Sequence, residues 1–393
     1  MAPHRADDAS AGLPSDRDPG RVHWMELFFD LIFVALVGQL AAGLHRNPTP
    51  LSLIVFLALF ATVWWSWVNL TFVVNIMTGL RQRQLAAVML SAMVMVGALA
   101  VAAPEATADR AWLFAAGNTA LRLLLLGLWV SRSWRNGDAA TRVRVSAYNG
   151  GTAVLWGISM WLPEPWNFVL WGVALAVEIT LIVASSPTWA FAALRNLNTD
   201  HLSERFGLLV VIILGESVLS TVVAVDETWT LPAAIAGALS LTILAALAWS
   251  FFMFGTSAMT AGLEKLKDDG NIVAIRDTVA FLPYLLVAGV TAISGSVAMA
   301  ITHPDTVLPF VSAVSLWGGI ALFFLTNAII SIRFGTAPRV VARWAIPAFV
   351  LVGALAVLGT TASGIWMLAG AAGALAITTL LAEGFRHQRL RGV

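Results

Sequence analysis

The stretch VHWMELFFDLIFVALVGQLAAGL, residues 22–44, decides the fold class. It is an apolar run long enough to cross the roughly 30 Å hydrocarbon core of a bilayer as a single helix. It has no small-residue cleavage site, so we expect it to be retained and not removed as a secretory signal. Two carboxylates, Glu26 and Asp30, interrupt it. The stretch therefore predicts a membrane-spanning helix that buries charge.

Apolar runs of similar length fill the rest of the chain. Of its 393 residues, 59% are hydrophobic and 11% are charged, and the mean hydropathy is +0.83; a soluble domain is about a quarter charged. The sequence thus predicts an all-α polytopic integral membrane bundle of about twelve transmembrane helices. The expected spans are 22–44, 51–76, 84–103, 111–131, 145–163, 166–185, 206–225, 230–256, 278–301, 307–331, 344–360 and 363–382.

The lysines and arginines alternate between the two sides of this layout. Basic residues are retained on the cytoplasmic side during membrane insertion. Of the 23 basic residues, all except Arg46, Arg110 and Arg122 lie in the N-terminal tail, in every second loop or in the C-terminal tail. The distribution predicts that both termini are cytoplasmic.

A weak internal repeat suggests two halves. The segment HWMELF at 23–28 opens the first span, and the similar segment HLSERF at 201–206 opens the seventh. Two six-helix halves in the same orientation would produce this repeat, and chance similarity in a leucine-rich sequence is the alternative. The expected divisions are a disordered cytoplasmic tail (1–21), a first half (22–185), a cytoplasmic linker (186–204), a second half (205–385) and a second tail (386–393).

Several classes of function are excluded by what the sequence lacks. It contains no cysteine, and therefore no disulfide, thiolate metal site or cysteine nucleophile. It has no phosphate-binding loop, dinucleotide fingerprint or nucleophile elbow. The net charge of +1 offers no attraction to nucleic acid. We predict no cofactor, no metal site and no nucleic-acid partner; membrane lipid is the expected surrounding, and the sequence makes no prediction of oligomeric state.

Ionisable residues inside the spans are the candidate functional residues, because each costs roughly 2.5 to 3.5 kcal/mol in hydrocarbon. They are Glu26, Asp30, Arg122, Glu178 and Glu216. Glu26 and Asp30 lie four residues apart on one helical face, so they repel each other unless a cation is close. Two interpretations stay open for them: groups that titrate during function, or a structural ion pair with a loop arginine.

Arg122 requires a partner near the middle of the membrane because it cannot lose its charge. Glu178 and Glu216 reach a similar depth, and Glu216 lies roughly 16 Å beyond Arg205 along one helix. One interpretation is a buried pair that only fixes helix packing. The other is a carboxylate cluster around Arg122 that binds an ion or passes a proton.

Two histidine–glutamate pairs form a secondary set of candidates. His23 with Glu26 and His201 with Glu204 are each spaced three residues apart, a spacing that can hold a metal. With so few histidines and no cysteine, we assign these pairs, and Arg205 beside them, mainly to helix starts and interfacial hydrogen bonds.

Two stretches carry a family resemblance. ELFFDLIFV at 26–34, preceded by His23 and Trp24, and HLSERFGLLVVIILGESV at 201–218 resemble the two signature stretches of the bacterial low temperature requirement A proteins. The resemblance implies a multi-pass protein of the bacterial cytoplasmic (inner) membrane, and it implies no established reaction. The segment WSFFM at 249–253 lacks the acidic residue that the resemblance leads us to expect near the eighth span.

Three functions are therefore open. The first is a proton- or ion-coupled transporter of a small solute, in which Arg122 balances the charge of the buried carboxylates. The second is a membrane-embedded enzyme that uses Asp30, Glu26 and Glu216 as general acid and base on a lipid or isoprenoid substrate. The third is a structural or regulatory membrane protein whose buried charges specify packing.

Overall fold

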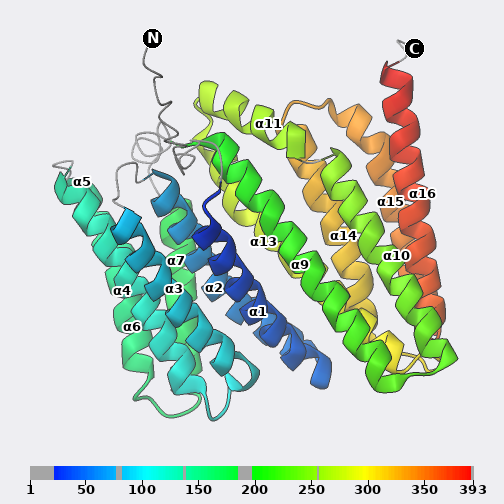
Figure 1. The fold of residues 1–393 in the computed structure, drawn as a ribbon, viewed down its shortest axis with the longest axis horizontal. Helices are drawn as coiled ribbons and strands as arrows, with labels where there is room; N and C mark the ends of the chain where they lie inside the picture. The colour runs from blue at the N-terminus through cyan, green and yellow to red at the C-terminus, as the bar shows by residue number, and fades with distance from the viewer. Residues whose placement is uncertain (1–21, 77–81, 136–138, 185–196, 255, 391–393) are drawn as a thin grey trace, which may run out of the picture.

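The computed structural model describes residues 22–76, 82–135, 139–184, 197–254 and 256–390. Within these ranges the chain is a bundle of long helices, and Figure 1 shows the first group of helices beside the second. The expected tail at 1–21 and the part of the expected linker before residue 197 lie outside the described residues.

The first group of helices carries the apolar runs up to residue 184. Its bounds are α1 (Trp24–Arg46), α2 (Pro50–Ile76), α3 (Gln82–Ala102), η1 (Ala103–Glu105), α4 (Ala111–Arg135), α5 (Ala139–Val145), η2 (Ser146–Gly150), α6 (Gly151–Ser159) and α7 (Trp166–Ala184). The segments α5, η2 and α6 form one continuous helix over 139–159 that contains a π-helical turn.

The second group follows from residue 199. Its bounds are α9 (Thr199–Thr228), α10 (Leu231–Phe254), α11 (Thr256–Asp268), α12 (Ile272–Arg276), η3 (Asp277–Phe281), α13 (Leu282–Thr302), α14 (Phe310–Arg333), α15 (Pro338–Gly359) and α16 (Gly364–Leu390). A second π-helical turn, η3, joins α12 to α13. The short α11 lies at the end of the bundle where α1 begins and α16 ends (Figure 1).

The expected all-α membrane bundle is confirmed. Ten helices in the described ranges are long and apolar enough to cross a membrane. The two remaining expected spans fall on the π-interrupted helix at 139–159 and on α16, whose apolar part, Gly364–Leu380, is shorter than the others. The total of twelve stays a prediction.

The two largest differences from the expected boundaries are at the start of α9 and at the end of α16. α9 begins at Thr199, inside the segment expected to be a linker, because the Asn198 side chain accepts a hydrogen bond from the backbone N–H of His201 at 3.1 Å and caps the helix. α16 continues to Leu390, through most of the segment expected to be a tail. The earlier start of α9 places Arg205 two turns inside the helix rather than at its entrance.

The two groups pack their helices in the same order. In the first group α1 packs on α2 and α3, and the packing continues through α4 and α6 to α7, which returns to α2. In the second group α9 packs on α10 and α13, and the packing continues through α14 and α15 to α16, which returns to α10. This common order supports the predicted repeat, which itself stays a prediction.

The seam between the groups is formed by α1 and α2 on one side and α9 and α13 on the other. Hydrogen bonds and ring contacts join α2 to η3 and α13 across this seam. The Trp64 indole N–H donates to the carbonyl of Ala280 at 2.8 Å, and the Tyr284 hydroxyl donates to the carbonyl of Leu57 at 2.9 Å. Phe60 stacks on Tyr284 with ring centroids 5.1 Å apart. These contacts hold α2 against η3 and α13, while the facing helices α1 and α9 bury charge.

Candidate functional site

Arg205 binds both carboxylates of the first span. Its Nη1 donates to Oε2 of Glu26 at 2.9 Å, and its Nε and Nη2 donate to the two oxygens of Asp30 at 3.1 and 3.0 Å. Arg205 and Asp30 have no exposed surface and Glu26 is 3% exposed. We call these three residues the Arg205 cluster. It joins α1 to α9 through charge-assisted hydrogen bonds, which are stronger than neutral ones.

Further donors and rings enclose the Arg205 cluster. The Trp67 indole N–H donates to Oδ1 of Asp30 at 2.7 Å, and its ring lies 5.4 Å from the Arg205 guanidinium. His201 Nε2 lies 3.4 Å from Oε2 of Glu26, and the Asn75 side chain contacts Nδ1 of the same histidine at 3.2 Å. Each charge in the cluster thus has several partners, which is the condition for burying charge.

This geometry matches the structural interpretation of Glu26 and Asp30, an ion pair with an arginine. Arg205, which the expected spans place in a loop, lies inside α9. The secondary candidates His23, His201, Glu204 and Arg205 have different roles in the structure. His201 and Arg205 contact the buried carboxylates, while His23 caps α1 by accepting from the Met25 N–H at 3.3 Å.

Glu204 accepts a hydrogen bond from the backbone N–H of Val22 at 3.2 Å and lies at the exposed start of the bundle. Across the described ranges, no three histidine, aspartate or glutamate side chains come close enough together to hold a metal ion.

Arg122 forms a separate buried pair in the first group of helices. Its Nη2 donates to Oε2 of Glu178 at 2.8 Å, and its Nη1 donates to Oδ1 of Asn118 at 2.8 Å. The Trp156 ring lies 5.3 Å from the guanidinium. Arg122 has no exposed surface and Glu178 is 2% exposed.

The expected clustering of the carboxylates around Arg122 is therefore wrong. Arg122 on α4 faces α7, and its carboxylate partner is Glu178. Glu26 and Asp30 face α9 and are neutralised there by Arg205. Spacing along the chain could not separate these cases, because the packing of the helices decides which buried charges meet.

Glu216 lies apart from both groups of charges, in a cavity of about 120 Å³ between α1, α9 and α13. We call it the Glu216 cavity. It is lined by Val34, Val37, Gly38, Ala41, Ala42, His45, Ile213, Glu216, Ser217, Ser220, Thr291, Ser294 and Ala298. No residue that the structure describes forms a hydrogen bond or ion pair with the Glu216 carboxylate. The volume accommodates several water molecules.

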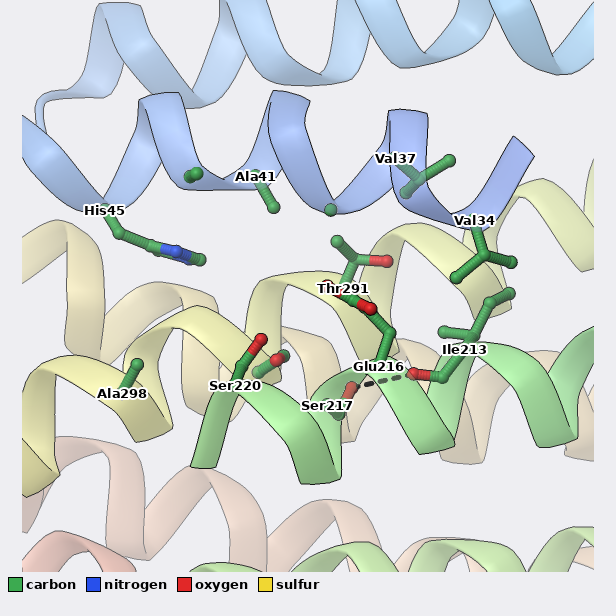
Figure 2. A pocket seen from close by; sticks show the side chains of 13 residues that line it. Val34, Val37, Ala41, His45, Ile213, Glu216, Ser217, Ser220, Thr291 and Ala298 are labelled. Carbon is green, nitrogen blue, oxygen red and sulfur yellow. Dashed lines mark hydrogen bonds between the residues drawn. The ribbon is translucent and has the colours of Figure 1, made fainter. Parts of the chain in front are cut away.

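Figure 2 shows Glu216 extending from α9 toward α1 and toward Thr291 of α13. The Ser217 hydroxyl beside it donates to the carbonyl of Ile213 at 3.0 Å. Two buried polar atoms in the cavity wall, Oγ1 of Thr291 and Nε2 of His45, have no hydrogen-bond partner. Buried polar atoms are usually paired, so the Thr291 hydroxyl and the His45 imidazole add unused hydrogen-bonding capacity to the cavity wall.

The His45 imidazole lies across Gly295 of α13. A side-chain carbon at position 295 would overlap the imidazole ring, so only glycine leaves room for it there. His45 belongs to the last turn of α1, and it closes the end of the cavity that is farther from the Arg205 cluster.

An apolar layer separates the Glu216 cavity from the Arg205 cluster. Along α1, the buried Phe33 lies between Asp30 and the cavity-lining Val34 and Val37, and along α9, the buried Leu209 lies between Arg205 and the cavity-lining Ile213. Eleven residues separate Arg205 from Glu216, a distance of roughly 16 Å along the helix. The α1–α9 interface therefore carries a buried charge cluster at one end and, at the other, a cavity that holds the Glu216 carboxylate.

Sequence reasoning missed several residues of these sites. Asn118 and Thr291 are uncharged, and nothing in their local sequence distinguishes them from other polar residues in apolar helices. His45 gave a usable signal, because it is one of only six histidines and ends an otherwise apolar span.

Comparisons with known proteins identify a family for the chain. Residues 21–383 match the family described as Bacterial low temperature requirement A protein (LtrA). The chain is 30% identical over 217 residues to "Uncharacterized protein RA0937" of Rhizobium meliloti (strain 1021), and the match covers 52% of this chain and 51% of that protein. The chain thus spans about half the length of that relative. No solved structure matches. Because the family match covers nearly the whole chain, this integral membrane protein belongs to the bacterial low temperature requirement A (LtrA) family.

Proposed function

We propose that the protein is a proton- or ion-coupled carrier of a small solute, with Glu216 as the group that binds the coupling ion. The observation that carries the proposal is that no residue which the structure describes pairs with the Glu216 carboxylate, which lies in a largely apolar cavity at the seam between the two groups of helices. A carboxylate in a membrane-spanning helix is costly unless it has a partner or water. Here the described side chains supply no cationic partner, so water, a proton or an ion takes that place.

The location of the cavity supports the same proposal. Carriers built from two repeats bind their substrates and coupling ions near the middle of the membrane, at the interface between repeats. Glu216 lies on α9 at the seam, with α1 of the first group and α13 of the second around it. Exchange of an ion at this point requires the two groups to shift against each other.

In this proposal the Arg205 cluster keeps one end of the α1–α9 interface closed while the two groups shift. It is buried, fully paired and attached to both α1 and α9. We assign it the role of the inner closure, which holds the two helices together at the end of the interface away from the cavity. Glu26 and Asp30 thus act in this proposal as fixed counter-charges of Arg205, and the pair of Arg122 with Glu178 holds the first group together.

We further propose that the protein lies in the bacterial cytoplasmic membrane with both termini inside. The alternation of lysine and arginine supports this orientation. Because the chain has no cysteine, single cysteines report the sidedness cleanly. We expect a membrane-impermeant maleimide added to intact spheroplasts to label Asp305→Cys and to leave Asp269→Cys unlabelled until the cells are lysed; the reverse pattern would invert the orientation. Both positions are exposed in the loops at opposite ends of the bundle.

Flux through purified protein in sealed liposomes tests the carrier proposal. An imposed proton or sodium gradient would be applied with pools of amino acids, sugars, nucleosides and small organic acids outside. We expect gradient-driven uptake of at least one pool, or dissipation of the gradient, well above the rate in empty liposomes. Rates equal to those of empty liposomes with every gradient and pool would contradict the proposal and would favour an enzyme acting on membrane lipid.

A further inference from the structure

We propose that the Glu216 cavity is a sodium site, in which the Glu216 carboxylate and the hydroxyls of α9 and α13 bind one monovalent cation. The inference deepens the proposed function by naming the coupling ion, and it rests on that function only for the ion's role in transport. Sodium binding can be measured without any transport.

The charge of the cavity fits a single positive charge. Among the described residues that line it, Glu216 and His45 are the titratable ones, and Glu216 alone supplies a negative charge. A calcium site uses several carboxylates, and magnesium keeps a strict octahedral shell. One carboxylate in a half-buried cavity matches a monovalent cation instead.

The remaining donors are oxygen atoms from two helices. Ser217 and Ser220 lie on α9, and Thr291 and Ser294 lie on α13, all in the wall around Glu216. A proton needs the carboxylate alone, whereas a hard cation needs several oxygen atoms to replace its water shell. Hydroxyl oxygens that face one carboxylate from a second helix therefore favour a cation over a proton.

The hydrogen bonds of these hydroxyls leave oxygen lone pairs available. The Ser217 hydroxyl donates its proton to the carbonyl of Ile213. The lone pairs of its oxygen are therefore available to accept a hydrogen bond or to bind a cation. Thr291 is 5% exposed, and its Oγ1 has no partner at all. Leaving a buried hydroxyl unpaired costs about 1 to 3 kcal/mol, and a cation beside Glu216 would remove that cost.

Sodium-dependent thermal unfolding of the purified protein in nanodiscs tests the site, with choline chloride keeping the ionic strength constant. We expect NaCl to raise the unfolding midpoint in a saturable way, because a ligand that binds only the folded state stabilises it, and choline to have no effect. Thr291→Val, which keeps the shape and removes the hydroxyl, should weaken the apparent sodium affinity at least tenfold. Glu216→Gln should abolish the shift.

Matched variants keep this test interpretable. Thr291→Ser retains the hydroxyl and should bind sodium within a few-fold of the wild type. Thr242→Val makes the same change on the exposed face of α10 and should leave the affinity unchanged. Equal midpoints in NaCl and choline chloride, or a Thr291→Val variant that binds sodium like the wild type, would overturn the inference.

The two proposals fail in distinguishable ways. If the protein shows no sodium-dependent shift but liposomes show flux driven by a proton gradient, the sodium site is wrong and the carrier stands. If sodium shifts the midpoint with the expected pattern of variants but no flux occurs, the sodium site stands and the carrier is wrong.

Discussion

Arg205→Gln is expected to destabilise the folded protein more than any other single substitution at the sites described here. The change removes the guanidinium that contacts both Glu26 and Asp30, and it leaves two carboxylates buried side by side on α1. Breaking a buried ion pair from one side costs about 3 to 5 kcal/mol. We expect a large fall in the unfolding midpoint in detergent, measured as the loss of monodisperse protein after heating.

Removing the charges together should reverse most of that loss. In Arg205→Gln with Glu26→Gln and Asp30→Asn, no uncompensated charge remains in the interior, and the Trp67 N–H still has an oxygen acceptor at position 30. Arg205→Lys keeps a charge but loses the fork that contacts both Asp30 oxygens, so an intermediate midpoint is expected. Arg46→Gln, at an exposed position, is the matched control. An Arg205→Gln protein as stable as this control would refute the closure role of the cluster.

The pair of Arg122 and Glu178 should show the second largest effect. Arg122→Gln leaves Glu178 without its cation, and Glu178→Gln leaves a guanidinium buried at mid-membrane beside Asn118. Each single change should cost about 3 to 5 kcal/mol, for the same reason as in the Arg205 cluster. The double variant should be more stable than the sum of the two single effects predicts, because it leaves no charge unpaired.

The double variant also decides between the two interpretations of this pair. If the pair only fixes the packing of α4 on α7, then Arg122→Gln with Glu178→Gln in well-folded protein should retain the flux of the wild type. A folded double variant without flux would place the pair on the transport path. A stability loss in the double variant equal to the sum of the two single losses would contradict the 2.8 Å contact between Arg122 and Glu178.

The sequence predicts the spans well and the pairing of buried charges poorly, for different physical reasons. A span is a local property, because about twenty consecutive apolar residues suffice to cross the bilayer. Every long expected span overlaps a helix of the structure, and the clearest shift, at α9, comes from a capping asparagine at position 198 that lies before the apolar run.

Pairing, by contrast, depends on which helices touch. The sequence singles out Glu26, Asp30, Arg122, Glu178 and Glu216 because charge in hydrocarbon is rare. It does not reveal that α1 packs on α9 or that Arg122 of α4 meets Glu178 of α7, so it leaves open which arginine pairs with which carboxylate. The cavity is invisible for a related reason, since it is formed by small residues and hydroxyls from three helices far apart in the chain.

The most direct test of the account compares gradient-driven flux in Glu216→Gln with that of the wild type. Glu216 has no partner to lose among the described residues, so the variant should fold and purify like the wild type, unlike Arg205→Gln. Glu227→Gln, an exposed change on the same helix, serves as the control. The account predicts wild-type flux in Glu227→Gln and flux at the level of empty liposomes in Glu216→Gln. Wild-type flux in a well-folded Glu216→Gln protein would contradict it.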